Sequence, residues 1–292
     1  MNNLPASTSF NPALTGFFNG LEFEDYLKLS GVSNSFMNQM AKSPEDALWY
    51  KRHEKKLETK SMEFGTHMHC AILEPNELDK RYAYMPDCDG RTKEGKSLKA
   101  EYEFKNAGKI VLKEELWESA QYVREKLLNH SRIPALLNNF TPEVSMQWEY
   151  DGLLYKGRCD ALHNEEPYIV DIKTAKSAHE NYFEHAIFNL GYHRQAAMYT
   201  HGCEVLGRKI KKYFIIAIEN TAPWKEALFE VPESAIEIGR AELKVLSDKY
   251  KECRKTNQWP GYSHEVKIVG VPHWKLQQLP DALLNNIGDI NE

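Results

Sequence analysis

The sequence predicts an α/β domain in which helices flank a central mixed sheet, and three observations support this fold class. Helical patterns fill most of the first half of the chain. An aromatic-rich hairpin and a third strand follow between residues 144 and 173. Helices, two further strands and a long final helix complete the order. Helices and strands that alternate in this way build a sheet covered by helices.

Length and composition describe an ordinary globular protein. The chain has 292 residues, of which 42% are apolar and 27% charged, enough for a large core. It contains no apolar run of the ~20 residues that a membrane span needs. Residues 1–8 lack the basic and apolar regions of a secretory signal. We therefore expect a cytoplasmic protein with no membrane partner.

Charge and cysteine content exclude further classes. The net charge of −5 argues against a protein that coats nucleic acid by bulk charge, but it allows a local basic groove. An odd, scattered set of cysteines does not fit a disulfide framework, and without a C-x-x-C spacing it does not fit a zinc or iron–sulfur site. The five cysteines are Cys70, Cys88, Cys159, Cys203 and Cys253.

The N-terminal part begins with a polar segment and then becomes helical. Residues 1–30 contain several asparagines and prolines, and we interpret them as a poorly ordered lead. Ser33 or Ser35 can cap a first helix, and Ser43 with the following proline opens a second one. The basic run Lys51–Lys60 fits a solvated helix face better than a phosphate contact.

Three segments precede the predicted sheet. Phe64–Leu73 is mostly apolar and predicts a buried helix that ends before Pro75. Asp87–Lys105 is charged and contains glycine, which indicates an exposed loop or lid. Glu114–Asn129 has the spacing of an amphipathic helix.

The strongest structural signal is a β-hairpin. Val144–Tyr150 and Leu153–Arg158 alternate between apolar and polar residues, and Asp151-Gly152 between them is a favoured two-residue turn. After a short polar loop, Tyr168–Lys173 predicts a third strand.

The C-terminal half adds helices and two more strands. His179–Leu206 is helical with a break near Gly191, Lys212–Glu219 and Ala227–Val231 are strands, and Glu233–Thr256 is a long helix. We expect a single domain over residues 31–262. The tail, residues 263–292, would pack on this domain or on a neighbouring subunit.

Two acidic residues and a lysine carry the chemistry that the pattern suggests. Asp171 and Lys173 are two residues apart on the third strand, so their side chains leave the same face. Asp160 ends the preceding strand, which hairpin logic places alongside. A charged pair inside an apolar strand is costly without a function, although a lone D-x-K can be an ordinary surface pair.

Such a set suits phosphodiester chemistry. Carboxylate oxygens bind hard cations such as Mg²⁺, for which Mn²⁺ can substitute. A cation held there can activate water and stabilise charge on a phosphate. A neighbouring lysine can orient or deprotonate the water, or stabilise the negative charge.

Several segments resemble one known family. GTHMHCAILEP, GRCDAL, VDIKTA and GYHRQAAMY follow one another at family-like spacing, as does the helix-opening segment SNSFMNQMAKSP. Together, over Ser33–Pro260, they resemble the RecE-type exonucleases (exonuclease VIII) of the PD-(D/E)xK nuclease superfamily. Cys159 occupies the place of the proline in the superfamily's name, a proline that is often missing.

The resemblance implies roles for individual residues. Asp160 and Asp171 would bind the metal, and His69 would join them, although without the resemblance a hydrogen-bonded core histidine is the favoured interpretation of His69. Lys173 would activate water and stabilise charge, and Gln195 would support the active site.

Four other residues receive weaker expectations. Tyr192, and with it Arg158 in the GRCDAL segment, would contact DNA. Tyr199 shares a helix face with Gln195 and Tyr192, and on its own fits core packing. Glu143 is a further candidate carboxylate, expected to support the ligands rather than to be one.

The resemblance also implies a function. The protein would be a Mg²⁺-dependent exodeoxyribonuclease that degrades one strand of a linear duplex 5′ to 3′. It would release mononucleotides and leave a 3′ overhang for a RecT-like single-strand annealing protein. Relatives of this type form homo-oligomeric rings around DNA.

Other functions stay open at this point. A PD-(D/E)xK endonuclease, a non-catalytic module that binds DNA ends, and a structural α/β protein with a fortuitous D-x-K are the alternatives. A relative with an iron–sulfur cluster would need four clustered cysteines, which the chain does not supply.

Overall fold

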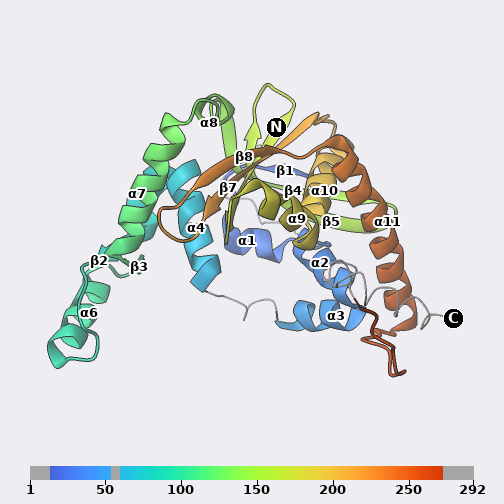
Figure 1. Cartoon of the computed structure of the whole chain (residues 1–292), viewed down its shortest axis with the longest axis horizontal. Helices are drawn as coiled ribbons and strands as arrows, with labels where there is room; N and C mark the ends of the chain where they lie inside the picture. The colour runs from blue at the N-terminus through green and yellow to red at the C-terminus, as the bar shows by residue number, and fades with distance from the viewer. Residues whose placement is uncertain (1–13, 54–59, 272–292) are drawn as a thin grey trace, which may run out of the picture. The chain divides into compact units, whose positions relative to one another are not determined.

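A mixed sheet forms the centre of the fold (Figure 1). The computed structural model describes residues 14–53 and 60–271, and in them six strands follow the order β1-β4-β5-β6-β7-β8. β6 and β7 are parallel, and the other neighbours are antiparallel. The predicted fold class is confirmed. The strands are β1 Gly16–Phe18, β4 Phe140–Tyr150, β5 Leu153–His163, β6 Tyr168–Ala175, β7 Lys212–Glu219 and β8 Glu226–Glu230.

The hairpin of β4 and β5 is the predicted one. Asp151 and Gly152 have φ values of +49° and +71°, the left-handed pair that a tight turn between twisted strands requires. Trp148 lies opposite Tyr155, and their rings stack with centroids 5.6 Å apart. Both strands extend further from the turn than their apolar patterns indicate.

Helices cover both faces of the sheet. Strand residues alternate between two apolar clusters, so that Ile169 packs on one side and Val170 on the other. In Figure 1, α4 and α7 lie to one side of the strands, and α10 and α11 to the other. On the α10 side lie α2 Asn34–Lys42, α3 Pro44–His53, α9 Glu180–Asn189, α10 Tyr192–Val205 and α11 Glu233–Thr256. On the α4 side lie α4 Lys60–Leu73, α5 Leu78–Arg81, α7 Glu114–Asn129 and α8 Ile133–Leu136.

The expected lead over residues 1–30 is wrong for its second half. β1 pairs with β4, and α1 spans Phe23–Lys28. Phe18 and Leu29 are buried, so these residues are held by tertiary contacts that their local composition does not reveal. Residues 1–13, and part of the basic run Lys51–Lys60, lie outside the described residues.

The segment expected to be an exposed loop or lid contains a regular helix. α6 spans Lys93–Lys105 between two short parallel strands, β2 Tyr82–Met85 and β3 Ile110–Lys113. Thr92 caps α6 by accepting a hydrogen bond from the Gly95 N–H. A short 3₁₀ turn, Pro75–Glu77, precedes α5.

The chain divides into two compact units, Met1–Trp259 and Pro260–Glu292. The first contains every helix and strand of the described residues, and residues 260–271 of the second form neither. The role of the tail in packing stays a prediction. None of the described helices is long and apolar enough to span a membrane.

Candidate functional site

Three adjacent strands each bring one carboxylate to the same level of the sheet. The register of β4 and β5 pairs the residues on either side of Glu143 with those on either side of Asp160, so the two side chains lie opposite each other. One further step along the β5–β6 register puts Asp160 opposite Asp171. Glu143, Asp160 and Asp171 therefore form a row across β4, β5 and β6, inside the strands and not at their ends.

The ladder between β5 and β6 ends where this row begins. Its two pairs join Ala161 with Val170 and Leu162 with Ile169. Beyond them the Ile172 N–H donates to the Oδ2 atom of Asp160 at 2.7 Å, in place of a backbone carbonyl. We call this point, with Asp160 on one side and Ile172 on the other, the β5–β6 fork.

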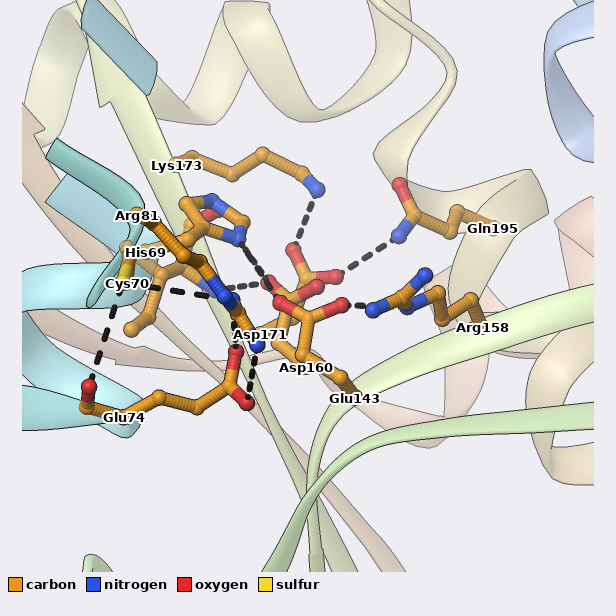
Figure 2. A network of polar contacts seen from close by, with 11 residues as sticks. His69, Cys70, Glu74, Arg81, Glu143, Arg158, Asp160, Asp171, Lys173 and Gln195 are labelled. Atoms are coloured by element: carbon orange, nitrogen blue, oxygen red, sulfur yellow. Dashed lines mark hydrogen bonds and ion pairs between the residues drawn. The ribbon is translucent and has the colours of Figure 1, made fainter. Parts of the chain in front are cut away.

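His69 reaches the fork from α4. Its Nε2 lies 2.9 Å from the carbonyl oxygen of Ile172, which can only accept, so Nε2 carries the proton. Its Nδ1 lies 3.6 Å from Asp160 Oδ2 and 3.7 Å from Glu143 Oε1 (Figure 2). These distances are too long for hydrogen bonds. A backbone carbonyl that fixes one ring nitrogen while the other faces carboxylates is typical of a metal-binding histidine.

Asp171 is held on both of its oxygens. Lys173 Nζ lies 2.5 Å from Oδ2, and Gln195 donates from Nε2 to Oδ1 at 2.6 Å (Figure 2). Asp171 is 1% exposed, so this geometry fixes a buried carboxylate. Tyr192 places its ring 5.2 Å from Lys173 Nζ, on the outer side of the same pair.

Glu143 and Arg158 form a second, partly buried pair at the other end of the row. Arg158 Nε lies 2.5 Å from Glu143 Oε2, and the guanidinium stands over the Phe23 ring at 5.5 Å. Side-chain exposure is 15% for Arg158 and 18% for Glu143. Arg158 is therefore engaged with a protein carboxylate, and its expected DNA contact stays a prediction.

Tyr199 positions α10 against the strand that carries Asp160. A Cβ atom on Gly157 would lie 2.8 Å from the Tyr199 ring, closer than real Cβ contacts. Glycine at 157 therefore lets α10 approach β5 closely. This contact explains the glycine of the GRCDAL segment. Tyr199 is a buried packing residue.

Burial and charge perturb the ionisation of the site. Burial raises the pKa of Asp160 to about 7, although His69 opposes the shift. Burial alone would lower the pKa of His69, but Asp160 and Glu143 outweigh it and raise that pKa to about 9. Burial would likewise lower the pKa of Lys173, and Asp171 raises it above its ordinary value. A buried carboxylate row of this kind favours a bound cation.

The residues present fit a divalent metal ion. Among the described residues, ligand atoms of His69, Glu143 and Asp160 all lie within 4.8 Å of one another. Oxygen donors with one imidazole suit Mg²⁺ or Mn²⁺. Of the three expected ligands, the structure brings His69 and Asp160 together and places Asp171 beside them, tied to Lys173 and Gln195.

The hairpin register predicts that Glu143 lies at the site, although Glu143 precedes the apolar part of the hairpin in the sequence. A two-residue turn at Asp151-Gly152 pairs Tyr150 with Leu153, and counting back along both strands reaches Glu143 and Asp160. The turn thus fixes that these two carboxylates face each other. The sequence therefore already indicates that Glu143 lies beside Asp160, while its supporting role stays a prediction.

Comparisons with known proteins concern the family and the fold. A family model described as a "PDDEXK-like domain of unknown function (DUF3799)" matches residues 33–270. A crystal structure from Eubacterium rectale, described as a "putative exonuclease", is similar in fold with a TM-score of 0.57 and 13% identity. The likeness covers 88% of this chain and 98% of that one.

The crystal structure of SSO0001 is 14% identical over 64% of this chain and 88% of that one, with a TM-score of 0.26. No curated protein matches the chain at a significant level.

Proposed function

The chain belongs to the PDDEXK-like DUF3799 family, and from this premise we propose that it is a metal-dependent exodeoxyribonuclease. The observation that carries the proposal is the convergence of Asp160, Asp171 and Lys173 at the β5–β6 fork, with His69 Nδ1 facing Asp160 at 3.6 Å. A set of this kind can bind a divalent cation beside a phosphodiester and hold an ammonium group next to it.

His69, Asp160 and Asp171 would hold the cation, with Mg²⁺ as the physiological ion and Mn²⁺ as a substitute. When bound, it supplies Lewis acidity toward a phosphate oxygen and makes a water molecule more acidic. His69 is oriented for this by its hydrogen bond to the Ile172 carbonyl. The ligands thus come from a helix and from both sides of the fork.

The roles of Lys173 and Gln195 follow from their contacts. Lys173 is held as an ammonium by Asp171 at 2.5 Å, so it stabilises negative charge on the phosphate and orients the attacking water. Gln195 fixes the other oxygen of Asp171 at 2.6 Å, which sets the direction of that carboxylate. Tyr192, whose ring lies 5.2 Å from Lys173 Nζ, would contact the DNA strand.

The finer assignment is an exonuclease of the RecE type acting in the cytoplasm. It rests on the resemblance of the GTHMHCAILEP, GRCDAL, VDIKTA and GYHRQAAMY segments. We propose degradation from double-stranded ends, 5′ to 3′, which leaves a 3′ overhang for a RecT-like annealing protein. A homo-oligomeric ring around the duplex would keep a net-acidic chain on its substrate. The alternatives are an endonuclease of the same superfamily and a non-catalytic end-binding module.

The test is digestion of linear duplex labelled at the 5′ or the 3′ end, beside a covalently closed circle, with and without Mg²⁺. We expect metal-dependent release of the 5′ label as mononucleotide, late loss of the 3′ label and an intact circle. Asp160→Asn serves as the inactive control. Equal degradation of the circle would support the endonuclease. Binding of ends without cleavage, in Mg²⁺ and in Mn²⁺, would support the end-binding module.

A further inference from the structure

Glu143 presents its two oxygens to different partners. Oε2 lies 2.5 Å from Arg158 Nε, whereas Oε1 faces His69 Nδ1 at 3.7 Å. The second distance is too long for a hydrogen bond. Two donor atoms that share a cation at about 2.0–2.4 Å lie roughly 3 to 4 Å apart. Oε1 is therefore at ligand spacing from His69 Nδ1.

Arg158 holds this carboxylate in place. Its Nε pairs with Glu143, its guanidinium lies over the ring of Phe23 at 5.5 Å, and the side chain is 15% exposed. Groups that orient ligands in this way tune metal affinity although they do not touch the ion.

The positions of the donor atoms also favour an ion in contact with Glu143. Arg158 pairs with Glu143 and Lys173 pairs with Asp171, whereas the ion-pair partner of Asp160 is His69. Glu143, Asp160 and His69 come from β4, β5 and α4, so their donor atoms enclose one point from three elements. Asp171, the remaining proposed ligand, also contacts Lys173 and Gln195.

We propose that Glu143 is a further direct ligand of the divalent cation, in addition to His69, Asp160 and Asp171, and that Arg158 is a positioning residue for it. The inference rests on the metal-dependent function proposed above. It gives Arg158 a task at the metal rather than on DNA.

The test is calorimetric titration of the protein with Mn²⁺ in the absence of DNA. Glu143→Gln should weaken Mn²⁺ binding by about 10- to 100-fold, and Glu143→Asp should also weaken it because the shorter side chain withdraws the oxygen. The matched control is Glu226→Gln, since Glu226 is also 18% exposed and is paired with Lys126 far from the row. Its Mn²⁺ affinity should equal that of the wild type.

Arg158 needs a readout that separates a metal role from a DNA role. Arg158→Gln should raise the Mn²⁺ concentration for half-maximal cleavage by about 10-fold, the lower end of the range for groups that orient ligands. Turnover should return toward the wild-type value at saturating Mn²⁺, and Arg158→Lys should be closer to wild type. Reduced turnover at every Mn²⁺ concentration, with an unchanged half-maximal point, would overturn the positioning role.

The outcomes separate this inference from the function beneath it. If the Glu143 variants bind Mn²⁺ like the wild type while Asp160→Asn does not, Glu143 is no ligand and the nuclease proposal stands. If Asp160→Asn also binds Mn²⁺ and cleaves DNA normally, the proposed function itself fails. Circular dichroism of each variant confirms that a loss of binding is not a loss of folding.

Discussion

Gln195 on α10 donates a hydrogen bond of 2.6 Å from Nε2 to the Oδ1 atom of Asp171 on β6, and Lys173 holds the other oxygen. A helix on one face of the sheet thereby sets the direction of a carboxylate inside it. The orientation of Asp171 depends on how α10 is docked as well as on its own strand.

Replacement of Gln195 by alanine should lower turnover by about 10- to 100-fold, the range found when a group that orients a ligand is removed. Asp171 would keep its pair with Lys173 but would lose its fixed direction. Steady-state cleavage of linear duplex measures the effect. Glu204→Gln, on the exposed side of α10, is the control. Wild-type turnover in Gln195→Ala would show that Lys173 alone suffices.

Replacement of Lys173 by alanine should abolish cleavage and leave Mn²⁺ affinity within a few fold of wild type, because the ammonium contacts Asp171 and is not a ligand. Calorimetry with Mn²⁺ and cleavage assays on the same sample separate the two properties. Near-normal turnover of Lys173→Ala on blunt duplex would contradict the assigned role.

Divalent metal should stabilise the folded protein. At a hundredfold excess over the dissociation constant, Mn²⁺ should add about 2.7 kcal/mol to the free energy of unfolding, seen as a higher melting temperature that EDTA reverses. Asp160→Asn should lose this shift, since Asp160 lies within ligand distance of both His69 and Glu143. An equal metal-induced shift in the variant would place the ion elsewhere.

The metal-free protein should lose stability as the pH rises. Burial raises the pKa of Asp160 from 3.8 to about 7, so its contribution is complete below pH 3.8 and disappears as the pH passes 7. The pKa of His69 is likewise raised, from 6.5 to about 9, so its contribution to stability is also lost as the pH rises between those values. Melting curves in EDTA from pH 5 to 9 should fall more steeply for the wild type than for Asp160→Asn. Parallel curves would contradict this linkage.

Replacement of Gly157 by alanine should cost about 1–3 kcal/mol, the range for overpacking a core. The new Cβ would lie 2.8 Å from the Tyr199 ring and 2.9 Å from Met146. Urea unfolding measures the loss. Gly90→Ala is the control, because a Cβ there meets nothing within 4 Å. Turnover should fall as well, since α10 also carries Gln195. Unchanged stability would mean that Tyr199 can move aside at no cost.

The sequence predicted the parts of the fold that are encoded locally. Asp151-Gly152 favours one turn, and that turn sets the whole β4–β5 register. Asp171 and Lys173 could be recognised because charged residues inside an apolar strand need a reason to be there. The ends of β7 and α11 match their apolar patterns.

Features that depend on distant contacts were missed. β1 has three residues and exists because β4 offers it an edge. The sequence of α6, Lys93–Lys105, has little apolar periodicity, so it resembles a loop. Thr92 is the one local residue that indicates a helix, because its side chain caps the N-terminus of α6. The pairing of Arg158 with Glu143 does not follow from the hairpin register alone, because it depends on the left-handed conformation of Glu143 (φ +51°), which sets the direction of its side chain.

At the β5–β6 fork the two strands lack the regular backbone hydrogen bonds of a sheet. Where the ladder stops, the Ile172 amide relies on a side chain instead of a neighbouring strand. Continuing the ladder past Ala161 and Val170 would give each strand its ordinary partner and a firmer structure, but it would replace the hydrogen bond from the Ile172 amide that orients the Asp160 carboxylate. In a version of this protein selected only for heat resistance, we would therefore expect the two strands to pair fully and the proposed activity to be lost.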